Sequence, residues 1–173
     1  MIAFTDVQYG EDSALAACVL ADDWSDATPR GSVTVRVSPI APYEPGAFYK
    51  RELPCLLAVL DATPKVTHVV IDGYVWLDSA GTPGLGAHLH AALGGTTAII
   101  GLAKTAYRGS EMASRLARPG SSQPLFLTSV GVEPTLAMDL VKRLHGPFRI
   151  PTLIKLADQL ARELITPTST ESP

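Results

Sequence analysis

The chain has 173 residues, 46% of them apolar, and a formal net charge of −3 at pH 7. That length supports one compact domain with a buried core, and no stretch reaches the roughly 20 uninterrupted apolar residues of a membrane span. The N-terminus has neither the basic flank nor the long apolar core of a secretory signal, and the two cysteines show no metal-type spacing or disulfide framework. We therefore expect a cytoplasmic monomer with a single domain over residues 1–165 and a flexible tail over residues 166–173.

The charge is distributed unevenly along the chain. Residues 1–103 carry 5 Lys and Arg against 11 Asp and Glu, whereas residues 104–162 carry 9 against 4. Basic side chains gathered along one groove would bind the phosphates of nucleic acid, but the same side chains scattered over the surface would only be solvated. The charge pattern therefore allows a nucleic-acid partner without requiring one.

Three apolar runs open the chain and predict strands. Residues 2–7 and 14–20 are short apolar runs, and residues 31–37 alternate apolar and polar side chains, as a half-buried strand does. Because the connections between them are short, we expect an antiparallel meander.

Helices and strands alternate in the rest of the chain. Apolar residues at helical spacing predict helices near residues 48–60, 85–93, 135–144 and 153–164. Apolar, β-branched runs predict strands over residues 66–71, 96–102 and 125–130, and Met112–Leu116 could form a short helical turn. This order predicts an α/β fold with a mixed sheet of about five or six strands, the first three antiparallel and the later ones parallel, flanked by helices.

Three acidic residues stand where a sheet enzyme would place metal ligands. Asp6 lies among the apolar residues of the first strand, Asp72 directly follows a buried central strand, and Glu52 lies early in the helix after a Pro/Gly loop. A buried carboxylate is costly unless it is paired or bound to a metal, and hard cations such as Mg²⁺ take oxygen ligands. The alternative is that Asp6 and Asp72 are edge or turn residues and Glu52 lies on a solvated helix face.

The segments around these acids resemble motifs of the endonuclease V family, in the same order, over about residues 2–162. The most specific is Pro42-Tyr43-Glu44-Pro45-Gly46, followed by Arg51-Glu52-Leu53-Pro54, which is similar to the family's Pro-Tyr-x-Pro-Gly loop and Arg-Glu-x-Pro helix. The other similar segments are Asp6-Val7-Gln8-Tyr9, Val70-Ile71-Asp72-Gly73, Gly84-Leu85-Gly86-Ala87-His88, Ile100-Gly101-Leu102-Ala103-Lys104, Phe148-Arg149-Ile150-Pro151 and Leu156-Ala157-Asp158.

The resemblance implies an RNase H-like fold and cleavage of DNA or RNA near a deaminated base such as inosine, with Mg²⁺ or Mn²⁺ as cofactor. At the matching positions, the metal-binding and catalytic acids would be Asp6, Glu52 and Asp72, and Lys104 would be a catalytic lysine beside them. The substrate-binding positions would be Tyr43, Pro45, Gly46 and Gly73, with the Tyr43 ring stacking in the space left by a displaced base. The ordinary alternatives are a loop-packing role for Tyr43 and a surface role for Lys104.

Two family histidines are absent from this chain. The family continues its Asp-Gly with a stretch that ends in His-Pro-Arg, whereas here Asp78 stands at the histidine's place. A later Gly-His pair of the family corresponds to Val130-Gly131-Val132-Glu133. In one interpretation Asp78 or Glu133 partly replaces the lost groups, and in the other the chain keeps the fold and the acids but cleaves poorly.

The sequence therefore supports a leading hypothesis and two alternatives. The leading hypothesis is a metal-dependent endonuclease acting in DNA repair or RNA processing. The first alternative is a catalytically weak or inactive relative that binds nucleic acid, and the second is a protein-interaction domain that binds neither metal nor nucleic acid.

Overall fold

The computed structural model describes residues 1–109 and 111–163, so the predicted tail lies outside the described residues. The strands are β1 (Ile2–Tyr9), β2 (Ala14–Ala21), β3 (Gly31–Val37), β4 (His68–Asp72), β5 (Ala98–Ala103), β6 (Ser114–Leu116) and β7 (Leu125–Val130). The helices are α1 (Tyr49–Asp61), α2 (Leu85–Ala92), α3 (Pro134–Lys142) and α4 (Thr152–Arg162). Within these residues, every helix is too short or too polar to cross a membrane.

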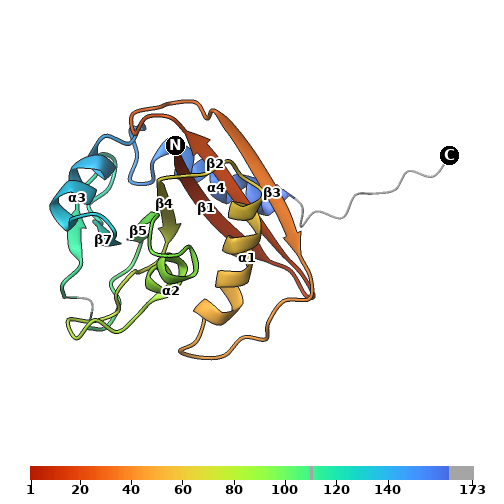
Figure 1. Cartoon of the computed structure of the whole chain (residues 1–173). Coiled ribbons are helices and arrows are strands. Elements are labelled where there is room, and N and C mark those ends of the chain that lie inside the picture. The colour runs from red at the N-terminus through yellow and green to blue at the C-terminus, as the bar shows by residue number, and fades with distance from the viewer. Residues whose placement is uncertain (110, 164–173) are drawn as a thin grey trace.

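The strands form one mixed sheet in the order β3-β2-β1-β4-β5-β7-β6 (Figure 1). The first three strands are antiparallel, and β4 and β5 run parallel to β1, which confirms the predicted mixed sheet. β7 lies antiparallel to β5 at the far side of the sheet. The predicted helical turn over Met112–Leu116 was wrong, because Ser114–Leu116 pair with Leu125–Leu127 and add a seventh strand within the described residues.

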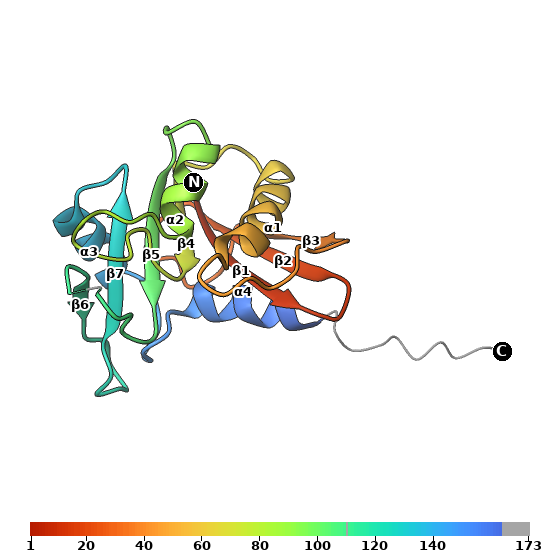
Figure 2. The ribbon, with the colours of Figure 1, turned by 90° about the horizontal axis from the view of Figure 1, so that it is seen from below.

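Helices cover both faces of this sheet, as Figure 2 shows with α4 on one side and α1 and α2 on the other. Side chains alternate between the two faces along a strand. Ile2 and Phe4 of β1 therefore pack with α3 and α4, whereas Ala3 between them packs with α1 and α2. By the same alternation, Asp6 should point toward the face that α4 covers.

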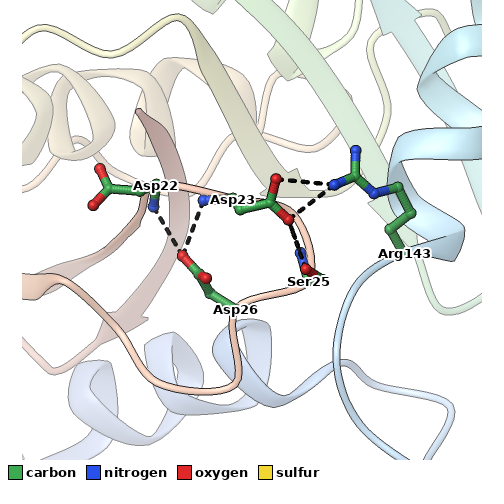
Figure 3. Close-up of polar contacts among 5 residues, drawn as sticks. All are labelled: Asp22, Asp23, Ser25, Asp26 and Arg143. Atoms are coloured by element: carbon green, nitrogen blue, oxygen red, sulfur yellow. Dashed lines mark hydrogen bonds and ion pairs between the residues drawn. The ribbon is translucent and has the colours of Figure 1, made fainter.

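An ion pair ties the end of α3 to the β2–β3 loop (Figure 3). Arg143 Nη2 lies 2.9 Å from both carboxylate oxygens of Asp23, and Asp23 also accepts hydrogen bonds from Ser25. Asp26 accepts hydrogen bonds from the backbone amides of Asp22 and Asp23. The acids of this loop thus shape its turns, and because Arg143 and Asp23 are half exposed, their pairing adds little stability.

Candidate metal centre and nucleic-acid cleft

Asp6 and Asp72 occupy matching positions on neighbouring parallel strands. The register of β1 and β4 pairs Ile2 with His68 and Phe4 with Val70. If this register is continued by two residues, Asp6 comes beside Asp72, and adjacent strands are roughly 4.8 Å apart; the charge of Asp72 also raises the pKa of Asp6. Asp6 lies two residues after Phe4, and Asp72 lies two residues after Val70, so both acids point to the same face of the sheet as these two residues. Phe4 and Val70 pack on the α4 side. The two carboxylates therefore meet at the carboxyl end of the central parallel strands, where α/β proteins commonly bind ligands.

Glu52 approaches the same edge of the sheet from the first turn of α1. Its side chain is buried, and its Oε2 has no hydrogen-bond partner among the described residues. Burial, followed by the charges of Asp6 and Asp72, raises the pKa of Glu52 to about 8. The three acids thus lie within electrostatic reach of one another, although they come from three separate elements.

Asp158 of α4 is a fourth acid at this place, and the sequence had given it no role. Burial raises the pKa of Asp6 to about 6, and the next largest cause is the charge of Asp158, ahead of that of Asp72. Arg162 lies one turn later on α4 and donates hydrogen bonds to Asp158. The match of Leu156-Ala157-Asp158 to the family's Ala-Asp element was the one signal in the sequence that pointed to this residue.

Lys104 directly follows β5 and reaches back to the acids. Its Nζ lies 2.6 Å from Oδ2 of Asp72. Burial works against the charge of Lys104, but the hydrogen bond and charge of Asp72 outweigh this effect and raise the lysine pKa. Lys104 thus brings a positive charge to the acid cluster, as a group that offsets phosphate charge must.

Two cavities open at the acids, one on each face of the sheet. The first, of about 470 Å³, lies on the α4 side and is lined by Asp6, Asp72, Lys104 and Asp158. The second, of about 540 Å³, lies on the α1 and α2 side and is lined among others by Gly46, Glu52, Asp72, Gly73, Tyr74 and Tyr107. Asp72 is a lining residue of both cavities. Hereafter we call them the α4 cavity and the α1 cavity.

The acids do not form a closed metal cage. Within residues 1–109 and 111–163, no group of three or more His, Cys, Asp or Glu side chains is arranged so that it could hold a metal ion by itself. A hard cation such as Mg²⁺ is usually held by only one or two carboxylates together with water and substrate phosphate, so an open cluster is suited to it. The buried Oε2 of Glu52, which lacks a partner, also fits a cation ligand, because an unpaired buried carboxylate is otherwise unfavourable.

The predicted substrate-binding residues divide between the cavity and the loop in front of it. Gly46, which has a φ of 79°, and Gly73 line the α1 cavity. The Tyr43 ring is 63% exposed on the loop that precedes α1, and Pro45 is exposed beside it. Tyr43 is thus not a packing residue of that loop, and its ring is accessible to a ligand.

The two acids considered as substitutes for the missing histidines lie elsewhere. Asp78 accepts hydrogen bonds from the backbone amide and hydroxyl of Thr82, and these bonds lower the Asp78 pKa. Its charge is not among the causes that shift the pKa of Asp6 or Glu52. Glu133 is the residue before α3, and it lines neither cavity. The geometry thus supplies no replacement for the histidines from these two positions.

Comparison with known proteins gives one consistent family. The model of the endonuclease V family matches residues 1–133. The endonuclease V of Rhodospirillum centenum is 29% identical over 186 residues, covering 92% of this chain and 76% of that protein. The crystal structure of endonuclease V from Streptomyces avermitilis superposes with a TM-score of 0.74 at 27% identity, covering 95% of this chain and 80% of that one.

A structure from Ciona intestinalis shares the fold at lower identity. It is an endonuclease V in complex with a 24mer DNA that contains an inosine followed by a ribo-adenosine. Its TM-score is 0.76 at 20% identity, and the match covers 95% of this chain and 85% of that one. Together with the family-model match over most of the sequence, these likenesses show that the chain belongs to the endonuclease V family.

Proposed function

We propose that this chain is a metal-dependent endonuclease that hydrolyses a phosphodiester bond in DNA or RNA near a deaminated base such as inosine. The observation that carries the proposal is the convergence of Asp6, Glu52 and Asp72 from β1, α1 and β4 at one edge of the sheet. Family membership and the inosine-containing DNA bound by the Ciona protein support the substrate class.

Asp6, Asp72 and Glu52 would hold Mg²⁺ or Mn²⁺ through carboxylate oxygens. Such a cation, when bound, activates water and stabilises the leaving oxygen of a phosphodiester. Deprotonation of Asp6 and Glu52 is a condition for this role, because metal ligands must be ionised. Lys104 lies beside Asp72 and would offset the charge of the scissile phosphate.

The α1 cavity would receive the deaminated base. Gly46 and Gly73 leave room at its mouth, and Tyr74 and Tyr107 present aromatic surface. Tyr74 is held in place because its hydroxyl donates to the Thr105 carbonyl at 2.8 Å and accepts from the Tyr107 amide at 3.2 Å. The exposed Tyr43 ring would stack where the displaced base leaves a gap.

The test is cleavage of inosine, uracil and undamaged oligonucleotides, as DNA and as RNA, with Mg²⁺ or Mn²⁺. We expect cleavage near inosine by the parental protein, and a loss of at least 100-fold in Asp6→Asn and Asp72→Asn, which keep the side-chain shape. Asp139→Asn is the matched control, since Asp139 is exposed on α3 and pairs with Lys142. Full activity in both site variants would exclude the proposed metal site.

A second candidate is a relative that binds nucleic acid without cleaving it. The observation in its favour is that Asp78 and Glu133 do not reach the acids, so nothing from those positions replaces the family histidines. This candidate predicts salt-sensitive binding with no cleavage under any metal, and little change in affinity for Asp72→Asn. Cleavage by the parental protein decides against it.

A further inference from the structure

Phe148 presents an aromatic ring at the rim of the α4 cavity. It lies between α3 and α4, its side chain is 63% exposed, and it lines the same cavity as Asp6 and Asp72. An exposed phenylalanine contributes nothing to the core, and none of the functions proposed above uses this one. Its place beside the acids suggests that it contacts the ligand on which they act.

The backbone that carries Phe148 is firmly anchored. Nε of the buried Arg118 donates to the Phe148 carbonyl at 3.3 Å. The next residue, Arg149, donates from Nη2 to the carbonyls of Pro124 and Lys104. Because the ring is held on a fixed backbone, stacking on it would cost less conformational entropy than stacking on a mobile loop.

Gly120 lies against Pro147 and Phe148, and because it has no side chain, the loop before β7 can pass close to these two residues. A Cβ at Gly120 would lie 3.2 Å from the Pro147 carbonyl oxygen and 3.5 Å from Cδ1 of Phe148. Its φ of 74° also favours glycine. The absence of a side chain at Gly120 thus lets the loop before β7 pass close to Phe148, which stays 63% exposed.

Lys155 adds a positive charge without a counter-charge to this cavity. It is exposed on the first turn of α4, and the structure gives its ammonium no carboxylate partner among residues 1–109 and 111–163. The other cations that line this cavity are engaged: Lys104 by Asp72, Arg162 by Asp158, and Arg149 by the backbone carbonyls of Lys104 and Pro124. Lys155 is therefore free to bind an anionic group such as a phosphate.

We propose that Phe148 and Lys155 form a subsite for one nucleotide of the substrate strand, across the scissile phosphate from the deaminated base. Phe148 stacks on the base of that nucleotide, and Lys155 binds its phosphate. This inference rests on the proposed function. Because Asp72 lines both cavities, a strand whose scissile phosphate lies at Asp72 has its deaminated base in the α1 cavity and continues into the α4 cavity.

The experiment measures binding and cleavage with the same set of inosine-containing single strands. Binding is followed by fluorescence anisotropy in Ca²⁺, and cleavage in Mg²⁺. We expect Phe148→Ala to weaken binding on the order of ten-fold, with recovery in Phe148→Trp, because base stacking needs an aromatic face. Lys155→Gln should weaken binding and reduce its dependence on salt. The matched controls are Leu136→Ala, 52% exposed on α3, and Lys142→Gln, also exposed on α3.

Strands shortened stepwise on either side of the inosine locate the subsite. The penalty of Phe148→Ala should disappear once the nucleotides on one side are removed and should persist when the other side is shortened. Equal affinities of Phe148→Ala and the parental protein, or a penalty that no truncation removes, would overturn the subsite.

Failure of the subsite and failure of the proposed function give different results. If the parental protein binds but does not cleave, and Phe148→Ala still weakens binding in the length-dependent way, the nuclease proposal fails and the subsite stands. If the parental protein cleaves and Phe148→Ala binds and cleaves equally well, only the subsite fails. If the parental protein neither binds nor cleaves, both are overturned.

Discussion

The ammonium of Lys104 lies 2.6 Å from Oδ2 of Asp72, a residue that lines both cavities. The two side chains are 44% and 38% exposed, so water screens the pair and a cation can compete with the lysine for the carboxylate. Lys104 would thus occupy one side of Asp72 in the absence of metal and face the phosphate in its presence.

Replacing Lys104 should separate metal binding from cleavage. In Lys104→Gln we expect half-maximal cleavage at a lower Mg²⁺ concentration, because the competing cation is gone. Cleavage at saturating Mg²⁺ should fall on the order of 100-fold, because a charge that stabilises the reacting phosphate is lost. A Mg²⁺ titration of the cleavage rate measures both quantities, with Lys142→Gln as the control. An unchanged saturating rate would remove Lys104 from the catalytic residues.

The raised pKa values of Glu52 and Asp6 should make the metal-free protein less stable at higher pH. Their pKa values are about 8 and about 6, against ordinary values of 4.5 and 3.8. Between the ordinary and the raised value, the folded protein holds more protons than the unfolded chain, so stability falls as the pH rises. Thermal unfolding with a chelator from pH 4.5 to 8.5 should show this fall, and Glu52→Gln should flatten it.

Adding Mg²⁺ should restore the stability that the metal-free protein loses at higher pH. Binding needs ionised carboxylates and so releases protons, which means that the rise in melting temperature on adding Mg²⁺ should be larger at pH 8 than at pH 5. Glu52→Gln and Asp6→Asn should reduce this rise, whereas Asp139→Asn should keep it. An equal rise at both pH values would indicate that Mg²⁺ binds away from Glu52 and Asp6.

Arg118 should be a major source of stability for the α3–α4 side. Its guanidinium is buried and donates to four backbone carbonyls, those of Phe148, Val141, Leu144 and Gly146. Arg118→Met would leave several of these acceptors unpaired, and we expect a loss of about 3 kcal/mol in the free energy of unfolding by urea. Arg118→Lys should not restore it, because one ammonium cannot reach all four. Arg115→Met, exposed on neighbouring β6, is the control and should change little.

Gly101 should be required for the placement of Asp72. A Cβ at this position of β5 would lie 2.5 Å from the Gly73 carbonyl oxygen and 3.1 Å from Oγ1 of Thr128. Gly101→Ala would push the backbone next to Asp72, so we expect about 1–3 kcal/mol of destabilisation and at least a ten-fold loss of kcat/KM. In Gly31→Ala the new methyl group meets nothing within 4 Å, and cleavage should stay at the parental rate. Parental activity in Gly101→Ala would show that this contact does not position Asp72.

The sequence predicted the central sheet because its signals are local. Alternation in residues 31–37 and the buried β-branched run that ends at Asp72 identify β3 and β4 from a few neighbouring residues. β6 was missed because Ser114–Leu116 are only three residues, two of them polar, whose strand conformation comes from pairing with β7. The antiparallel direction of β7 likewise depends on the path of residues 104–124, which local periodicity does not describe.

The residues of the candidate site also differ in how much the sequence alone reveals of their role. Motifs beside Asp6, Glu52 and Asp72 marked these residues in the sequence, and their role as metal ligands stays a prediction. Asp158 and Phe148 also lie in segments that resemble family motifs, but the sequence assigned them no role, because their place beside the acids depends on how α4 and its preceding loop pack against β1. Asp78 shows the reverse: its position suggested a histidine substitute, but its carboxylate instead caps the turn at Thr82.

The packing of α4 against β1 joins segments that lie far apart along the chain and are therefore synthesised at different times. Asp6 is synthesised before the wall formed by Phe148, Lys155 and Asp158, which follows about 150 residues later along the chain. A partly synthesised chain, held close to messenger and ribosomal RNA, would thus carry the first acids without the surface that fixes a strand beside them.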